Sequence, residues 1–327
     1  MKYVLNKKNI RWGIIGLGHI ADKFAQDLVT VQNSELYAVA SRSQEKADEF
    51  VQQFKASKAY NSYKTLAQDP NVDAVYIATP HSFHKEHSIL CLQHQKAVLC
   101  EKPFAMNLAE VTEIIAVAKE NNTLVMEALW TYFLPHYQYV LELIKNQTFG
   151  KVIQLEVNFG FQPTYNLESR VFKKEVGGGS LLDIGIYPIF VALSALGNPE
   201  NIEAKATFFE NGVDASCDML FQYKNTKAIL KSTFLEETPI DAIFTCEKGI
   251  VKLNSRFHEP TTVTLIANGK EEIIDFTTET FGYNFEIEHF NNLLRENKKE
   301  SDIMTFEFSK NLIKTLDTVR SIIGLKY

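Results

Sequence analysis

The sequence predicts an α/β fold in two parts: a doubly wound parallel domain, followed by an α+β domain with a large, mostly antiparallel sheet. Three observations carry this prediction. A glycine turn separates an apolar run from an amphipathic stretch near the start of the chain, buried strands and helices then alternate, and period-two patterns follow. We expect one domain over residues 1–124 and a second over 125–327.

Length and composition fit this division. A chain of 327 residues is long enough for two domains with cores of their own, and 45% hydrophobic with 23% charged residues is ordinary globular composition. Lys and Arg number 34 against 40 Asp and Glu, a net charge of -6, so we expect no nucleic-acid partner and no anionic membrane partner. The apolar run over 184–196 contains Pro188 and is too short to span a bilayer. The N-terminus has no export pattern, so we predict a cytoplasmic protein.

The cysteines and histidines predict no metal site. Cys91, Cys100, Cys217 and Cys246 are far apart and lack zinc-site spacing, so we interpret them as reduced, mostly buried thiols. His84, His87 and His94 lie on one short predicted helix without a supporting ligand pattern.

The first predicted unit is strand, glycine turn and helix. Gly16 permits a tight turn, Gly18 lets a diphosphate approach the backbone, and Ala21 lets the helix pack on the strand. The amides at His19 and Ile20, where the helix begins, would hold the phosphates. An ordinary strand-to-helix turn is the alternative. A second apolar strand follows at the expected separation, which favours a dinucleotide-binding Rossmann domain.

The rest of the first part continues the alternation. Asn107 and Glu110 stand at capping positions, and Thr79-Pro80 and Pro103 stop two strands, because proline cannot continue a central ladder. We predict strands over 36–40, 74–78, 97–100 and 123–126, and helices over 45–54, 83–95 and 108–120.

The second part is predicted to be mostly antiparallel. Lys248-Gly249 and Asn268-Gly269 are hairpin turns. After a helix that begins near Pro135, we predict strands over 153–159, 202–209, 214–223, 228–234, 240–245, 250–253, 262–267 and 273–276, then helices over 283–296 and 306–323.

Aromatic residues in the predicted strands indicate that one face of this sheet forms an interface. The aromatic residues Phe221, Tyr223, Phe234 and Phe244 offer material for an exposed apolar surface, and we expect a homodimer through the sheets. The alternative is a sheet that its own chain covers.

Ser41-Arg42 ends the second predicted strand, where an NAD-selective fold places an acid. Arg42 can pair with a ribose 2'-phosphate and Ser41 can donate a hydrogen bond to it, which favours NADP while leaving NAD possible. The alternative is that Ser41 caps the next helix and Arg42 is solvated.

Two polar strand ends complete the predicted crevice, and they carry a family resemblance. The runs Thr79-Pro80-His81-Ser82-Phe83-His84 and Cys100-Glu101-Lys102-Pro103 resemble the oxidoreductase family named for glucose-fructose oxidoreductase, inositol dehydrogenase and rhizopine catabolism proteins. The resemblance implies that Lys102 lies beside the nicotinamide as a catalytic residue. It also implies that Glu101, Thr79, Pro80 and His84 shape the cofactor site. Without these motifs, Lys102 would be read as a solvated lysine.

Two further runs, residues 127–135 and 177–188, resemble the branch of this family that contains dimeric dihydrodiol dehydrogenase, also described as an NADP-dependent D-xylose dehydrogenase. The resemblance implies a cofactor contact at Trp130. Tyr132 stands where relatives often carry Arg, which affects the polar contacts near the nicotinamide and the substrate preference. The glycines 177–179 are typical of a loop, or let substrate or cofactor approach the backbone.

Asp183 and Tyr187 are four residues apart on a predicted helix, so both side chains project from one face. Family members use His or Tyr at the second position as proton donor or acceptor. A tyrosine with its ordinary pKa of about 10 needs a nearby cation to act as a base at neutral pH, and Lys102 would supply it. The alternatives are a capping box of Ser180 with Asp183, and core packing of Tyr187.

Together these features predict an NADP-dependent dehydrogenase that moves a hydride between the nicotinamide and a secondary alcohol or carbonyl of a sugar-like or diol substrate. Phe161 and Tyr165 are possible walls of its pocket. The alternatives are an NAD-dependent inositol or amino-sugar dehydrogenase, and a non-catalytic NADP-binding regulator.

Overall fold

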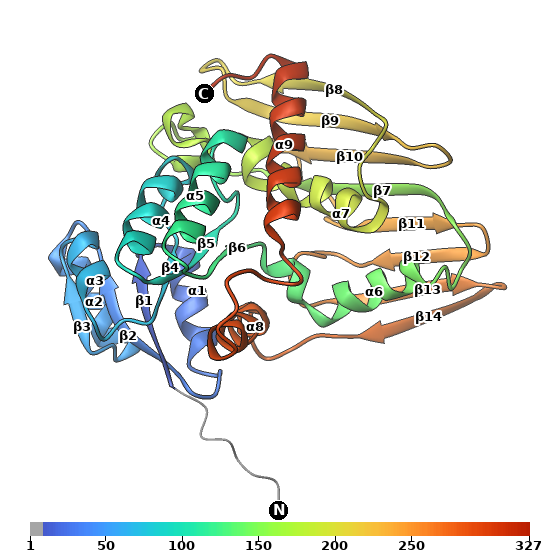
Figure 1. Cartoon of the computed structure of the whole chain (residues 1–327). Coiled ribbons are helices and arrows are strands. Elements are labelled where there is room, and N and C mark those ends of the chain that lie inside the picture. Colours follow the sequence, from blue (N-terminus) through green and yellow to red (C-terminus); the bar gives the residue numbers. More distant parts are fainter. Residues whose placement is uncertain (1–8) are drawn as a thin grey trace, which may run out of the picture. The chain divides into compact units, whose positions relative to one another are not determined.

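The computed structural model describes residues 9–327, which form two compact units (Figure 1). The first unit contains the described residues up to Trp130 together with Thr280–Lys310, and the second contains Thr131–Glu279 with Asn311–Tyr327. The boundary expected after residue 124 falls just before the strand Val125–Ala128, which pairs with its neighbour in the first unit's sheet.

The first unit is built on a six-stranded parallel sheet of order β3-β2-β1-β4-β5-β6. This is the strand order of dinucleotide-binding folds. All strands run parallel, and successive strands are added on one side of β1 up to β3 and on its other side from β4 onward. The predicted α/β class is therefore confirmed for this part of the chain. The strands are β1 (Ile10–Ile15), β2 (Ser34–Ala40), β3 (Lys58–Tyr60), β4 (Ala74–Ile77), β5 (Ala97–Glu101) and β6 (Val125–Ala128).

Helices connect these strands and pack on the sheet. Asn107 caps α5 as expected, because its side chain accepts a hydrogen bond from the Glu110 amide at 3.0 Å. The sequence did not reveal β3 or α3, which are too short to show a period. The helices are α1 (His19–Leu28), α2 (Gln44–Phe54), α3 (Tyr63–Gln68), α4 (His84–Gln93), α5 (Leu108–Glu120) and α8 (Tyr283–Arg295), with 3₁₀ turns at His81–Phe83 and Trp130–Phe133.

Helix α8 comes late in the chain, yet it packs on α1 within the first unit. The buried carboxylate of Asp27 accepts hydrogen bonds from the amides of Phe281 at 3.0 Å and Tyr283 at 2.8 Å, where α8 begins. Farther along α8, the side chain of Asn291 accepts a hydrogen bond from the Trp12 indole at 3.2 Å. These polar contacts fix the late segment to the start of the chain.

The second unit is built on an eight-stranded sheet of order β14-β13-β12-β11-β7-β10-β9-β8. Only the β7–β10 pair is parallel, so the predicted, mostly antiparallel sheet is confirmed. The strands are β7 (Val152–Gly160), β8 (Asn201–Phe208), β9 (Asp214–Gln222), β10 (Lys227–Thr233), β11 (Ala242–Cys246), β12 (Gly249–Leu253), β13 (Thr262–Ala267) and β14 (Lys270–Asp275).

Helices of the second unit cover one face of this sheet, as Figure 1 shows for α6 (Pro135–Lys145) and α7 (Ile186–Leu196). The π-helical turn Leu181–Gly185 leads directly into α7, where the sequence predicted a regular helix. The last helix, α9 (Phe306–Ile323), has its first residues in the first unit and the rest in the second. Short 3₁₀ turns at Arg170–Phe172 and Lys174–Val176 precede the π-helical turn.

The aromatic surface predicted for the sheet is wrong. Phe221, Phe234 and Phe244 are at most 2% exposed, and Tyr223 is half-buried. Strand alternation shows which residues share a face, but these residues belong to the covered face. The open face carries aliphatic and charged side chains instead, among them Leu220, which is half-buried, and Ile229, which is exposed.

One described helical segment, Lys174–Leu196, is long and apolar enough to cross a membrane by length and composition alone. It is longer than the run that the sequence suggested. However, 83% of its most apolar window is buried inside the structure, as is usual for the core helix of a soluble fold.

Asp27→Ala should destabilise the first unit, because it leaves the amides at the start of α8 without their acceptor. We expect a loss of about 1–3 kcal/mol in the free energy of unfolding, measured in urea. Asp27→Asn keeps one acceptor oxygen and should lose less. Glu49→Ala, an exposed change on α2, should stay within about 0.5 kcal/mol of the parent chain. Equal losses in Asp27→Ala and Glu49→Ala would contradict the capping role.

Candidate active site

Two glycines in the turn between β1 and α1 serve different purposes. Gly16 is required by a close backbone contact, whereas Gly18 leaves the backbone accessible. Gly16 has a φ of +91°, and a Cβ there would lie 2.7 Å from the backbone of Ala78 and Thr79. Only glycine fits this close approach. A Cβ at Gly18 would meet no atom within 4 Å, and His19 beside it is exposed. The first amides of α1 therefore face accessible space, as a phosphate site requires.

Ser41 and Arg42 follow β2. The helix cap considered at Ser41 as the alternative is not found: Ser43 is the cap, accepting from the Lys46 amide at 3.3 Å, while Ser41 Oγ accepts from the Ser43 amide at 3.2 Å. Arg42 is exposed and lies near enough to His87 to help lower its pKa to about 4, for which burial is the main cause.

His87 belongs to an aromatic group beside Arg42. Its ring lies 4.7 Å from that of Tyr63 and 5.8 Å from that of Phe83, and its Nδ1 lies 3.0 Å from Thr79 Oγ1. The charge of Arg42 also opposes the rise that burial causes in the pKa of Tyr63. A guanidinium beside flat rings at the end of β2 is a suitable place for an adenosine ribose and its phosphate.

His84 connects the two polar strand ends. Its Nδ1 lies 2.8 Å from the carbonyl oxygen of Pro103, and its Nε2 lies 2.7 Å from that of Thr79. The ring is fully buried, and burial lowers its pKa to about 4. A neutral imidazole carries one N–H, so His84 donates to one carbonyl at a time. The ends of β4 and β5 are thus held together, as expected of residues that shape one site.

Glu101 ends β5 and is partly exposed. Its Oε1 accepts a hydrogen bond from the Tyr76 hydroxyl, and its Oε2 accepts one from the Lys102 amide at 3.2 Å. Lys102 is also partly exposed and is joined to Pro103 by a cis peptide bond. The structure therefore brings together Thr79, His84, Glu101 and Lys102, which the sequence predicted as neighbours.

Glu286 on α8 is a residue that the sequence gave no reason to choose. Its side chain is completely buried, and neither carboxylate oxygen has a hydrogen-bond partner among the described residues. Burial, with the charges of Glu101 and Asp27, raises its pKa well above the ordinary value. Glu286 therefore keeps its proton to a higher pH than an ordinary glutamate does, within electrostatic reach of Glu101.

Trp130 lies where the first unit's sheet ends. Its indole is 5% exposed and stacks on the ring of Tyr283, with centroids 4.4 Å apart and planes at 14°. Trp130, for which the sequence predicted a cofactor contact, is thus a well-packed side chain of the first unit.

In the second unit, Asp183 lies in the π-helical turn and is 5% exposed. Its Oδ1 accepts a hydrogen bond from Arg170 Nη1 at 3.1 Å. The capping box considered for Ser180 and Asp183 is wrong, because Ser180 Oγ donates instead to Asp214 Oδ2 at 2.9 Å. π-helical turns are frequent at functional sites.

Two of the three glycines before this turn, Gly178 and Gly179, have a packing explanation. A Cβ at Gly179, whose φ is +122°, would lie 1.9 Å from Asp214 Oδ1, and one at Gly178 would lie 2.7 Å from the carbonyl of Lys173. Asp214 also accepts from the Leu181 amide at 2.6 Å, and burial raises its pKa to about 6. The glycines therefore let the chain approach itself and fix the start of the π-helical turn.

Tyr187 is the first buried aromatic residue of α7, 5% exposed. Its ring centroid lies 5.4 Å from that of Phe159 and 5.4 Å from that of His258. His258, 8% exposed, is a titratable neighbour that the sequence analysis missed, since it lies in a loop 71 positions away with no local motif. Its carbonyl is held by the Thr131 hydroxyl at 3.0 Å.

A cavity of about 380 Å³ lies in the same unit. Tyr165, which the sequence suggested as a wall of the substrate pocket, is one of the residues that line this cavity. Phe161 is not among the lining residues but packs on Phe234, which is, with centroids 5.2 Å apart. Tyr132 is half-buried against Phe190, 5.0 Å between centroids, so an aromatic contact stands at the position where relatives often have Arg. The lining residues are Gln162, Pro163, Thr164, Tyr165, Phe172, Phe209, Phe234 and Leu235.

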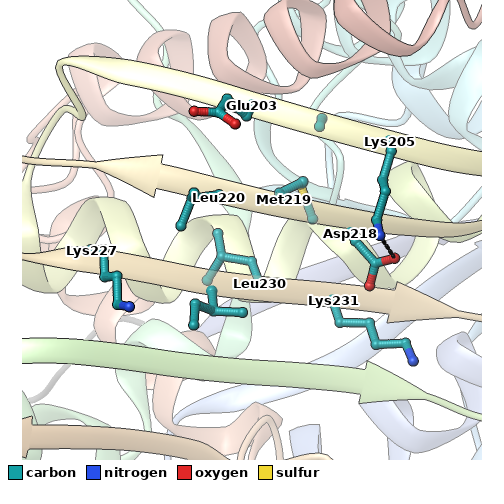
Figure 2. Close-up of a pocket in the computed structure, with 10 residues that line it drawn as sticks. Glu203, Lys205, Asp218, Met219, Leu220, Lys227, Leu230 and Lys231 are labelled. Atoms are coloured by element: carbon teal, nitrogen blue, oxygen red, sulfur yellow. Dashed lines mark ion pairs between the residues drawn. The ribbon is translucent and has the colours of Figure 1, made fainter.

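A larger hollow, about 560 Å³, lies on the open face of the sheet over β8, β9 and β10, and no predicted site residue lines it. Figure 2 shows Leu220 beside charged side chains that line this hollow, with Lys205 Nζ 3.9 Å from Asp218 Oδ2. Among residues 9–327 no group of three or more potential ligands suits a metal ion. All four cysteines are buried free thiols, as expected.

Comparison with protein families gives two matches. The family described as an oxidoreductase family with an NAD-binding Rossmann fold matches residues 10–129. The C-terminal domain of the GFO/IDH/MocA proteins matches residues 137–252. The two matches cover both parts of the predicted fold.

Individual relatives match nearly the whole chain. The chain is 37% identical to the trans-1,2-dihydrobenzene-1,2-diol dehydrogenase of Xenopus tropicalis, covering 97% of this chain and 99% of the relative. It is 33% identical to the NADP-dependent scyllo-inositol 2-dehydrogenase of Bacillus subtilis, covering 97% and 98%. A solved 3-ketoreductase from Actinomadura kijaniata, in complex with NADP and TDP-benzene, superposes with a TM-score of 0.87 at 25% identity, covering 97% and 98%.

Glu286→Gln tests the buried acid. Because the pKa of Glu286 is raised in the folded chain, only the unfolded chain ionises as the pH rises above about 4.5, and the parent chain loses stability over that range. Glutamine cannot ionise. The stability gain of the variant should grow by about 1.4 kcal/mol per pH unit between pH 5 and the folded pKa, measured by urea unfolding. Glu288→Gln, on the exposed side of α8, should show no trend; a trend as large as that of Glu286→Gln would refute the assignment.

Proposed function

Because the chain belongs to the oxidoreductase family named for glucose-fructose oxidoreductase, inositol dehydrogenase and rhizopine catabolism proteins, we propose that it is an NADP-dependent dehydrogenase of sugar-like or diol substrates. The first unit binds the cofactor and the second binds the substrate. The observation that carries the proposal is a buried Asp183 and Tyr187 in the second unit, in a chain whose first unit holds Lys102 at the end of β5.

The residues of the first unit fit a dinucleotide phosphate. Gly16 and Gly18 leave the start of α1 accessible, and Arg42 provides an exposed guanidinium near the end of β2. Positions 41 and 42, at the end of β2, carry Ser and Arg and no carboxylate that would hold the ribose hydroxyls of NAD. These residues support NADP over NAD. When bound, NADP would supply the hydride acceptor or donor.

Tyr187 is the proposed acid and base, taking or giving the proton of the reacting hydroxyl. Lys102 contributes the positive charge that lowers the energy of the phenolate. Glu101, which accepts from the Lys102 amide, and His84, which holds the following turn, position Lys102.

Asp183 orients the reacting hydroxyl rather than removing its proton. Its Oδ1 already accepts a hydrogen bond from Arg170, and a carboxylate paired with a guanidinium is a weaker base. The half-exposed Arg170 is well placed to bind a further oxygen of a polyhydroxylated substrate.

The substrate itself is best found with a panel of aldoses, ketoses, inositols and diols. Inositols belong on it because one relative is a scyllo-inositol dehydrogenase. An NAD-dependent inositol or amino-sugar dehydrogenase would show the opposite cofactor preference. Tight NADP binding without turnover on any member would favour a non-catalytic regulator.

The proposed assembly is a homodimer through the open face of the second unit's sheet, in the cytoplasm. Ile229, which lines the hollow over β8, β9 and β10, and Ile273 on the edge strand β14 are 41% and 62% exposed on this face. Exposed aliphatic side chains on an uncovered sheet are typical of an interface. The four unpaired thiols agree with a reducing compartment.

Arg42→Ala should weaken NADP binding far more than NAD binding. A charge-assisted hydrogen bond to a 2'-phosphate contributes about 1.5–3 kcal/mol, roughly ten- to a hundredfold in Kd. Fluorescence titration with the reduced cofactors NADPH and NADH measures both constants. Lys145→Ala, which removes one exposed positive charge from the second unit, should change neither. An unchanged NADP constant in Arg42→Ala would remove this residue from the site.

Tyr187→Phe should lower kcat by about 10² to 10⁴ while NADP still binds, because the ring is kept and the proton path is lost. Lys102→Met should cause comparable damage and move the pH profile upward. The double variant should resemble the worse single variant, since the two residues act as one unit. Steady-state kinetics over pH measures all three.

Two conservative changes serve as controls for this series. Tyr139→Phe on α6 and Lys145→Met at its end make the same chemical changes at partly exposed or exposed positions and should keep normal turnover. Near-normal turnover in Tyr187→Phe would mean that another group carries the proton.

Light scattering at micromolar concentration should give twice the chain mass of 37.2 kDa. Ile229→Asp places a charge in the proposed interface and should give monomers, because burying an unpaired charge is costly. Ile322→Asp, at an exposed position of α9, should leave the dimer intact. A monomeric parent chain would refute the assembly.

A further inference from the structure

The turn Lys102–Phe104, here called the lysine turn, connects β5 to the loop before α5. Its amide at Lys102 donates to Glu101 at 3.2 Å, and its carbonyl at Pro103 faces His84 at 2.8 Å. A third contact closes the turn: the Phe104 amide donates to Glu127 Oε1 at 3.0 Å. The position of the Lys102 backbone therefore depends on three side chains from three different elements.

Glu127 is the least expected of these three. It lies on β6, directly opposite Cys100 of β5, and is 3% exposed. Its Oε2 has no hydrogen-bond partner among the described residues. Placing a carboxylate in such surroundings is costly, and a glutamine would hold the Phe104 amide with the same shape. Packing and the hydrogen bond to Phe104 alone therefore do not account for an ionisable side chain at position 127.

The groups that face Glu127 come from β5, the lysine turn and α9. Burial raises its pKa to about 7; the neighbouring Ser309 hydroxyl and the Phe104 amide lower it, the charge of Glu101 raises it, and that of Lys102 lowers it. The Cys100 thiol, also buried, feels the charge of Glu127 in turn. Glu127 thus changes its charge near neutral pH, within electrostatic reach of Lys102.

We propose that Glu127 is a positioning residue for Lys102: its carboxylate holds the lysine turn, and its ionisation adds a second negative charge, beside that of Glu101, next to the Lys102 ammonium. This inference rests on the proposed function, because it assigns Glu127 to the lysine of that same site. An ionised acceptor binds an amide more strongly than a neutral one, so the turn is held more firmly as Glu127 loses its proton. Turnover should therefore rise through neutral pH.

The kinetic test measures kcat of the full chain with NADP between pH 5.5 and 8.5. Glu127→Gln keeps an oxygen for the Phe104 amide but has no charge, so kcat should lose its rise near pH 7 and fall about 3- to 10-fold at pH 8. Glu127→Ala releases the turn and should lose about 10- to 100-fold, with the KM for NADP little changed.

Two more variants separate this role from simple packing. Ser309→Ala removes a group that lowers the pKa of Glu127, so the rise in kcat should move to higher pH with the same plateau. Glu120→Gln, at the exposed end of α5, should reproduce the parent profile. A Glu127→Gln profile with the parent's rise near pH 7 would overturn the inference.

A chemical measurement tests the same inference without turnover. Acetic anhydride labels amines only in their neutral form, and mass spectrometry of peptides gives the rate at Lys102, with exposed Lys64 as the internal reference. Removing a neighbouring negative charge destabilises the ammonium, so Glu127→Gln should label Lys102 about 3- to 10-fold faster at pH 8. An unchanged rate overturns the inference even if the enzyme is active. If labelling responds but no substrate turns over, the proposed function fails and the electrostatic link between Glu127 and Lys102 stands.

Discussion

The carboxylate of Asp27 holds the start of α8, and the surroundings of Lys102 depend on that contact. The amides of Phe281 and Tyr283 converge on it. Once α8 is fixed there, Tyr283 stacks on Trp130, and Glu286, one turn farther along, comes within electrostatic reach of Glu101. Residues more than 250 positions later in the sequence thus complete a site that begins with the glycine turn. The chain between these two segments forms the second unit.

Three glutamates of the first unit, Glu101, Glu127 and Glu286, differ in burial and in their hydrogen-bond donors. Glu101 accepts from a tyrosine hydroxyl and an amide, Glu127 from one amide, and Glu286 from no described group. Burial raises the pKa of Glu127 to about 7 and that of Glu286 well above its ordinary value. Since a desolvated carboxylate needs donors to keep its charge, burial and the available donors together govern where negative charge lies around Lys102.

Sequence patterns predicted the parts of this structure that have a local cause. The glycine turn, the polar strand ends and the period-two strands each depend on neighbours within a few residues, and the structure has all of them. The covered face of the large sheet could not be predicted, because alternation around Phe221 separates two faces without showing which one the helices pack on. Glu127, His258 and Glu286 were missed as site residues because their partners are set by tertiary packing, which leaves no spacing signal.

The second unit shows how a rigid scaffold can orient one acidic side chain. Asp214 accepts from Ser180 and from the Leu181 amide, which fixes the first residues of the π-helical turn, and Gly179 is needed for the backbone to come that close. Asp183 follows two residues later, and its pairing with Arg170 sets the direction of its carboxylate. A side chain whose backbone is fixed and whose carboxylate is already paired loses little conformational freedom when it binds a ligand. Such preorganisation supports the proposal that Asp183 orients a hydroxyl while Tyr187 transfers the proton.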